Sequence, residues 1–331
     1  MNLLGKITIS RIPGLKAEEK VFLSSALIDR RAILQLSCRE IESMLGRRIR
    51  LKKYCPQTVL MEAEMIVDWI DTNNAHIVCL DDPNYPAMLR EIYDPPYLLY
   101  YLGTLPPQET PAVGIVGTRH ASPASERASF RIGLEAGTAG IPVISGLALG
   151  IDSAAHTGVI SVSGATWGIL GSGIGNIYPS TSLRIISSML EYRGGIMSEY
   201  PPLESPLRWH FPARNRIISG LCRAVCIIEA PERSGALITA SFALEQGRDV
   251  YVHAVGLLSR TSKGTKKLAD EGASVLSSLR EVCSDWGWDP AIIPDISVIK
   301  REELVSARSK ILASGSREGT LFRFQDTWFK I

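Results

Sequence analysis

The sequence lacks the features that mark membrane-spanning, secreted and zinc-binding proteins. None of its apolar runs reaches the roughly 18 residues that a membrane-spanning helix requires, and its first residues lack the pattern of a secretory signal. The six cysteines form no CxxC pair, and no histidine stands at zinc-finger spacing from them. We therefore expect a cytoplasmic protein that has no membrane partner, binds no metal and keeps its cysteines reduced.

An excess of charge of one sign is also absent. The formal net charge is +2, from 36 basic and 34 acidic residues, so composition alone does not indicate a nucleic-acid-binding protein. Basic residues are nevertheless concentrated locally, from Arg208 to Arg223 and from Arg260 to Lys267. A solvated surface explains these clusters at least as well as a binding site does.

The motifs of common enzymes are missing as well. There is no HExxH, no GxSxG and no P-loop, and the first glycine-rich turn, at residues 114–119, does not fit GxGxxG. We therefore expect no cofactor and no enzymatic activity. Asp152 and His156 are spaced i and i+4 and could form an acid-base or metal pair. Hydrogen bonds to neighbouring loops are the simpler interpretation of this pair.

The pattern along the chain divides it into three parts. Residues 1–75 are predicted to form short helices, a small domain like a SAM or helix-hairpin-helix unit, in which Ile12-Pro13-Gly14 is either a DNA-binding hairpin or an ordinary turn. Residues 76–288 form the main domain. Residues 289–331 are a short tail with one expected helix, Glu302–Leu312, and no winged helix.

The main domain alternates short apolar strands with helices. Such alternation predicts an α/β fold, with a Rossmann-like, doubly wound and mostly parallel sheet that helices cover on both faces. Ser122-Pro123 has the pattern of a helix start, and Gly140 and Gly247 stand where helices should end. The expected strands are Tyr97–Tyr101, Val113–Val116, Val143–Ile144, Thr166–Leu170, Ile196–Met197, Val225–Ile228 and Val250–Val255.

Four glycine-rich turns follow these strands. They are Gly117-Thr118-Arg119, Ser145-Gly146, Gly171-Ser172-Gly173 and Arg233-Ser234-Gly235. Glycine lets a phosphate approach the backbone, a hydroxyl adds a donor, and an arginine adds charge in a two-pronged geometry. Because the carboxyl ends of parallel strands meet at one edge of the sheet, four such turns favour a phosphate site there.

A fifth segment, residues 211–216, indicates what kind of molecule carries the phosphate. Phe211 is followed by Arg214, Asn215 and Arg216, and an aromatic ring beside arginines can stack a base while the cations neutralise its backbone. The alternative is equally consistent with the spacing. In that alternative Phe211 packs inside and the arginines pair with Glu199 or Glu229.

At this point the chain resembles one family, the DNA-processing protein A group, also called DprA or Smf. The resemblance runs from about Asp82 to Ala273 and includes residues 115–119, 145–156, 198–202, 211–221 and 229–240. It implies an extended Rossmann fold, a homodimer, binding of single-stranded DNA without chemistry, and delivery of that DNA to the RecA recombinase. The family pattern differs here at Gly175, Ser182 and the lysine-rich stretch that begins at Lys263.

The leading hypothesis is therefore a single-stranded DNA-binding protein that protects incoming DNA and loads RecA during natural transformation or recombination. The alternative is an enzyme of the nucleoside-monophosphate phosphoribohydrolase type, although its PGGxGTxxE motif is replaced by residues 230–237 here. A third possibility is a protein-interaction scaffold. The predicted DNA or phosphate site consists of Gly117, Thr118, Arg119, Ser145, Gly146, Gly171, Ser172, Phe211, Arg214, Asn215, Arg216, Ser234, Gly235 and Lys263.

Overall fold

The computed structural model describes residues 2–27, 37–49, 54–259, 262–293, 321–324 and 327–330. The helix expected at Glu302–Leu312 lies outside these residues. Near the carboxyl end, β10 (Leu321–Phe324) pairs antiparallel with β11 (Thr327–Lys330). Within the described part of the chain, no helix is long and apolar enough to cross a membrane.

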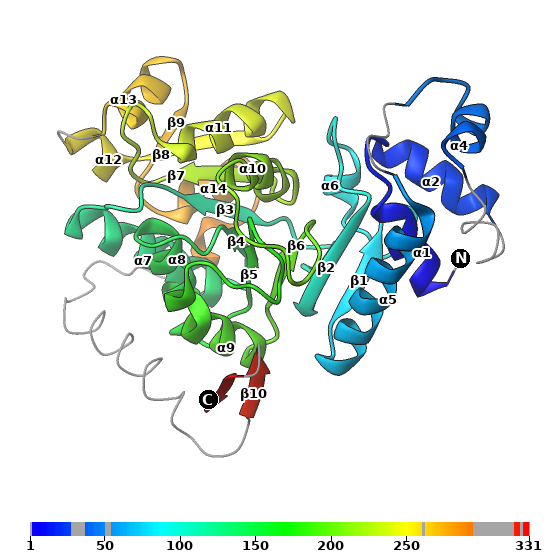
Figure 1. Ribbon diagram of the computed structural model, residues 1–331. Coiled ribbons are helices and arrows are strands. Elements are labelled where there is room, and N and C mark those ends of the chain that lie inside the picture. The colour runs from blue at the N-terminus through cyan, green and yellow to red at the C-terminus, as the bar shows by residue number, and fades with distance from the viewer. Residues whose placement is uncertain are drawn as a thin grey trace.

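A nine-stranded sheet forms the centre of the protein (Figure 1). Its order is β1-β2-β6-β5-β4-β3-β7-β8-β9, and β3 to β9 are parallel, while β1 and β2 are antiparallel to their neighbours. The strands are β1 (His76–Cys79), β2 (Leu98–Gly103), β3 (Val113–Val116), β4 (Val143–Ser145), β5 (Thr166–Ile169), β6 (Gly195–Ser198), β7 (Ala224–Ile227), β8 (Asp249–His253) and β9 (Ser274–Leu276). The predicted doubly wound, mostly parallel sheet is confirmed.

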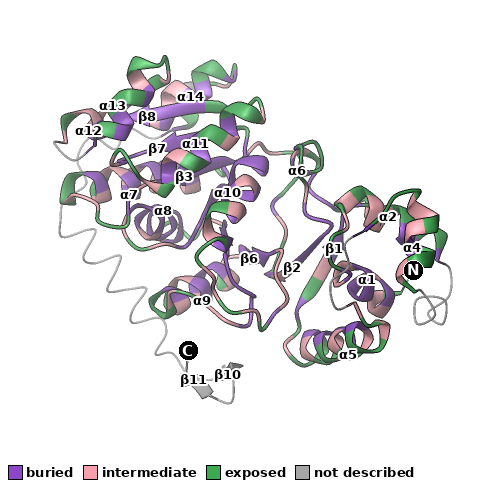
Figure 2. Cartoon of the chain, turned by 45° about the horizontal axis from the view of Figure 1, so that its top comes forward, coloured by how far each residue is buried: buried purple, intermediate pink, exposed green. Residues whose placement is uncertain are grey.

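Helices cover both faces of this sheet, which is why its inner strands are buried along their whole length (Figure 2). One face packs against α7 (Pro123–Thr138), α8 (Ile151–Ile160) and α14 (Leu279–Asp285). The other packs against α6 (Ala87–Arg90), α10 (His210–Gly220), α11 (Gly235–Glu245) and α13 (Lys263–Asp270). Ser122 caps α7 and Pro123 begins it, as the sequence predicts.

The amino-terminal helices lie beside the β1–β2 edge of the sheet (Figure 1). They are α1 (Leu3–Ser10), α2 (Ala17–Ala26), α4 (Cys38–Leu45) and α5 (Pro56–Thr72). Together with α9 (Leu183–Glu191) they share one apolar cluster with Leu98 and Tyr100 of β2. The domain boundary expected near residue 75 stays a prediction, because the helices and the edge strand have a common core.

Three strand predictions need correction. The sequence did not lead us to expect the edge strands β1 and β9, which are fixed by pairing with β2 and β8. The run expected to continue as a strand to Val255 ends at His253, where α12 (Ala254–Leu258) begins. The His253 ring accepts a hydrogen bond from the Val255 amide, at 3.1 Å, and this cap starts a helix within an apolar run.

Candidate nucleic-acid interface

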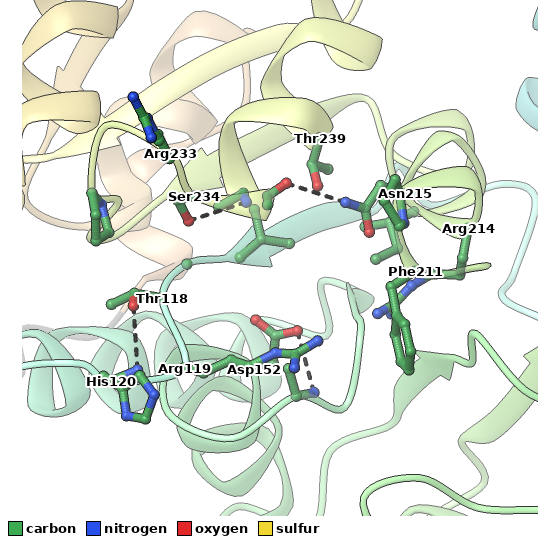
Figure 3. A pocket seen from close by; sticks show the side chains of 18 of the residues that line it. Thr118, Arg119, His120, Asp152, Phe211, Arg214, Asn215, Arg233, Ser234 and Thr239 are labelled. Atoms are coloured by element: carbon green, nitrogen blue, oxygen red, sulfur yellow. Dashed lines mark hydrogen bonds between the residues drawn. The ribbon is translucent and has the colours of Figure 1, made fainter. Parts of the chain in front are cut away.

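A pocket of about 690 Å³ opens where the turns after β3 and β7 meet the start of α10 (Figure 3). From β3 the chain continues to β4 on one side, and it later returns to place β7 on the other. This is the position at which doubly wound sheets bind ligands. The pocket is lined by Val116, Gly117, Thr118, Arg119, His120, Ala148, Asp152, Tyr178, Pro206, Arg208, Phe211, Pro212, Arg214, Asn215, Ile218, Pro231, Arg233, Ser234, Gly235, Ala236 and Thr239.

The turn after β3 presents Arg119 to this pocket. The Thr118 amide donates to the Glu229 carbonyl at 2.8 Å, and the His120 amide donates to the Thr118 hydroxyl at 3.2 Å. The exposed Arg119 side chain extends from the turn toward the side where Phe211 stands (Figure 3), with its Cζ 5.4 Å from the centre of that ring. Arg119 therefore combines a solvent-accessible charge with an aromatic neighbour.

Phe211 and Tyr178 form an aromatic wall. Their ring centres are 5.8 Å apart, with 60° between the planes, and Tyr178 is half exposed. Phe211 lies so close to Gly171 that a Cβ there would stand 2.9 Å from a ring carbon. Gly171 therefore serves the pocket indirectly, because it leaves room for the Phe211 ring.

The floor of the pocket contains a buried arginine and a buried carboxylate. Arg214 is 4% exposed, and its Nη1 donates to the Ile169 carbonyl at 2.5 Å. Asp152 accepts from the Gly146 amide at 3.1 Å and from the Ala148 amide at 3.4 Å. Burial raises the pKa of Asp152 to about 6 although Arg214 opposes the rise, and burial lowers the pKa of Arg214 only to about 10. Arg214 therefore stays charged at neutral pH.

The start of α11 forms the opposite wall. The Ser234 hydroxyl accepts from the Ala236 amide at 3.2 Å, and the Asn215 amide group donates to the Gly235 carbonyl at 3.2 Å (Figure 3). These bonds fix the amino-terminal end of α11 against the pocket. A helix start carries partial positive charge and backbone donors, both of which favour an anion.

The lining is strongly basic although the whole chain is nearly neutral. Four arginines, at positions 119, 208, 214 and 233, face a single carboxylate, that of Asp152. The formal charge of the lining is thus +3 with His120 neutral. Arg119, Arg208 and Arg233 are exposed, so they can reach a ligand in the opening.

The chain is similar to known proteins over most of its length. Residues 76–287 match the family model described as DNA recombination-mediator protein A. The chain belongs to this family. The chain is 39% identical over 256 residues to Protein Smf of Synechocystis. The matched region covers 76% of this chain and 62% of Protein Smf, so the chain spans less than two thirds of the length of this relative. It is 41% identical over 210 residues to the DNA processing protein DprA of Streptococcus pneumoniae, covering 62% of this chain and 72% of that one.

Solved structures of the family have the same fold. The X-ray structure of DprA from Streptococcus pneumoniae superposes with a TM-score of 0.67 at 32% identity, over 85% of this chain and 97% of that one. The Helicobacter pylori DNA processing protein A, whose structure concerns its single-stranded DNA binding mode, superposes with a TM-score of 0.57 at 27% identity, over 64% and 95%.

Eight of the fourteen predicted site residues of this family member line the pocket: Gly117, Thr118, Arg119, Phe211, Arg214, Asn215, Ser234 and Gly235. Others lie behind the lining. Gly146 and Gly171 give room to the side chains of Arg214 and Phe211, respectively. The buried Ser145 hydroxyl donates to the Ile115 carbonyl at 2.6 Å, and Ser172 is 1% exposed. Lys263 is exposed at the start of α13, outside the pocket.

Arg216 also lies outside the pocket, in an ion-pair network. Its guanidinium donates to both carboxylate oxygens of Glu199, at 2.7 and 3.0 Å, and its Nε donates to Asp94 at 3.1 Å. The sequence left open whether the arginines of this family member contact a ligand or pair with carboxylates. The structure shows ion pairing for Arg216, whereas Phe211 and Arg214 line the pocket.

Asp152 and His156 do not bond to each other. The His156 Nδ1 lies 2.8 Å from the Thr166 hydroxyl, while Asp152 accepts from loop amides. Burial lowers the pKa of His156 to about 3, so this ring is neutral under ordinary conditions. Hydrogen bonding to neighbouring segments, the simpler of the two interpretations of this spacing, is confirmed.

The sequence missed several lining residues. Arg233 directly precedes the predicted Ser234-Gly235 turn, and Arg208 belongs to a basic cluster, so both had a local signal. His120 and Thr239 had weaker signals, as neighbours of predicted turns. Tyr178 had none, because it reaches the pocket from the long loop after β5.

Proposed function

We propose that this protein binds single-stranded DNA in the pocket between the β3 turn, α10 and α11. The observation that carries the proposal is the combination of a lining charge of +3 with the aromatic wall of Phe211 and Tyr178. Cations neutralise a phosphate backbone, and aromatic rings stack unpaired bases. The single-stranded DNA binding mode of the Helicobacter pylori relative supports the same ligand.

Each part of the pocket has a role in this proposal. Arg119, Arg233 and the start of α11 hold phosphate oxygens, while a base stacks against Phe211. The positive charge of Arg214 at the floor of the pocket attracts the phosphates, while its guanidinium stays hydrogen-bonded to the Ile169 carbonyl. In a duplex the bases are stacked inside the helix and cannot reach Phe211, so the pocket selects for single strands.

The proposal also covers the four predicted residues whose side chains do not line the pocket. Lys263 begins α13, which packs against the Pro231 carbonyl, and we propose that it contacts a phosphate beyond Arg233. Ser145 and Ser172 support the turns beneath the lining, and we assign them no direct contact. Arg216, paired with two carboxylates, is likewise left out of the contact set.

We extend the proposal to the cell from family membership. In it, the protein is a homodimer that protects incoming single-stranded DNA and loads RecA onto it during transformation or recombination, without cofactor or catalysis. A RecA strand-exchange assay on DNA coated with single-strand binding protein tests this step. Purified protein should shorten the lag before exchange, and an unchanged lag would contradict the loading role.

Fluorescence anisotropy tests the DNA site itself. Labelled oligo-dT should bind more tightly than a duplex of equal length, and log K should fall linearly with log salt. Arg119→Ala should weaken binding and reduce that slope by about 0.7, the value for one phosphate contact on a single strand. Arg39→Ala serves as the control, because Arg39 is an exposed arginine of the distant helix α4 (Figure 1). A preference for duplex, or equal slopes for the two variants, would refute the assignment.

The phosphoribohydrolase alternative is disfavoured by the lining. Such an enzyme needs a carboxylate at the glycosidic bond, whereas the one carboxylate among the described lining residues, Asp152, is buried and accepts two amide hydrogens. Incubation of purified protein with nucleoside monophosphates tests this directly. Release of free base would restore the enzymatic hypothesis.

A further inference from the structure

Trp209 is an exposed aromatic residue next in sequence to Arg208, which lines the pocket. It is 67% exposed, whereas Trp167 and Trp286 are buried. It stands at the start of α10, between Arg208 and Phe211, both of which line the pocket, but it does not itself belong to the lining. Its ring is therefore accessible to a ligand that extends out of the pocket past Arg208.

The indole contacts one of two stacked aromatic rings. Its ring lies edge-on to the His210 ring, with centres 6.0 Å apart and 83° between the planes. His210 is 7% exposed and is itself stacked on Tyr200, with centres 3.8 Å apart and 20° between the planes. The Tyr200 amide donates to the buried Ser198 hydroxyl of β6 at 3.0 Å. Contacts thus run from the sheet to the indole, and they leave most of its surface in solvent.

We infer that Trp209 is a second base-stacking platform, which takes the base next to the one held on Phe211. This inference rests on the proposed function. Arg208 directly precedes Trp209 in the sequence and lines the pocket, so it can neutralise the phosphate that joins the two nucleotides. The ligand class is a nucleobase of any identity, because every base has a face that stacks on an indole.

Binding measurements on two ligands of different length test the platform. Trp209→Ala should weaken dT12 binding roughly fivefold or more, the lower end for loss of one stacked base, without changing the salt slope. Binding of thymidine monophosphate, which occupies the pocket alone, should stay within twofold. Trp209→Phe should recover most of the dT12 affinity. Tyr93→Ala is the matched control, since Tyr93 is a fully exposed aromatic residue outside the pocket lining.

Tryptophan fluorescence provides an independent readout. Stacking should quench the emission of the unaltered protein on addition of dT12, and Trp209→Phe should abolish that quenching. Persistent quenching in Trp209→Phe, or equal dT12 affinity of Trp209→Ala and Tyr93→Ala, would overturn the inference. If the unaltered protein binds neither ligand, the proposed function fails as well, so the two failures are distinguishable.

Discussion

Replacement of Gly146 by alanine should displace Arg214, a residue of the pocket lining. A Cβ at this position would lie 2.7 Å from the guanidinium carbon of Arg214, closer than real Cβ contacts allow. Arg214 would have to move, although its Nη1 is bonded to the Ile169 carbonyl and it is nearly fully buried. The change therefore combines overpacking with the loss of a charged hydrogen bond.

The magnitude follows from these two effects. Overpacking of a dense interior costs about 1–3 kcal/mol, and a hydrogen bond to a charged group contributes about 1.5–3 kcal/mol. Alanine offsets up to about 1 kcal/mol of this by restricting the unfolded chain. We expect the free energy of unfolding of Gly146→Ala to fall by about 2–4 kcal/mol, and its DNA affinity to fall as well.

Gly235→Ala is the matched control. Nothing lies within 4 Å of a Cβ at Gly235, and alanine is favoured over glycine in a helix, so stability should be unchanged or rise by less than about 1 kcal/mol. Its methyl group would nevertheless stand in the proposed phosphate site and weaken DNA binding. Urea denaturation followed by circular dichroism, together with anisotropy, separates the two effects. Equal unfolding midpoints for both variants would refute the reasoning about Arg214.

Three further predictions concern ionisable groups that are wholly or partly buried. The pKa of Asp152, about 6, exceeds its ordinary value of 3.8, so the folded protein binds a proton more tightly and this carboxyl costs stability as pH rises from about 4 to 6. Between about pH 4 and 6 the free energy of unfolding of the unaltered protein should fall by at most about 3 kcal/mol more than that of Asp152→Asn. If the unfolding free energies of the two proteins change in parallel with pH, the prediction is wrong. Arg216→Ala should lower the free energy of unfolding by about 2 kcal/mol, because Glu199 loses its ion-pair partner. The slope of log K against log salt for DNA binding should stay unchanged in this variant. A reduced slope would instead show that Arg216 contacts a phosphate. The His156 ring should show no NMR titration between pH 5 and 8, since burial depresses its pKa to about 3, and a midpoint near 6.5 would show that the ring is solvated.

Local sequence patterns were sufficient to predict much of the fold. The first parallel strand has the predicted bounds, and the Ser122-Pro123 helix start is confirmed. Such features depend on neighbouring residues, because alternation, caps and turns are short-range effects. The short edge strands β1 and β9 were missed, since pairing with the rest of the sheet rather than their own sequence fixes them.

The arginines of α10 show why the site was harder to predict. Arg214 and Arg216 are two positions apart and identical in type, yet one lies beneath the pocket and the other pairs with Glu199. What separates them is the position of the Ile169 carbonyl and the Glu199 carboxylate, which belong to other segments. Likewise, the turns at Gly146 and Gly171 look like phosphate turns in sequence, but side chains from α10 occupy the space beside them.

The order of the segments that line the pocket has a consequence for synthesis of the chain. The β3 turn is made early, but α10 follows three further strands, and α11 comes only after β7. A nascent chain that ends before α10 therefore displays Arg119 without Phe211 and without the start of α11, both of which line the complete pocket. Contacts between distant segments also form slowly during folding. The proposed binding site is thus assembled only when most of the sheet has been made.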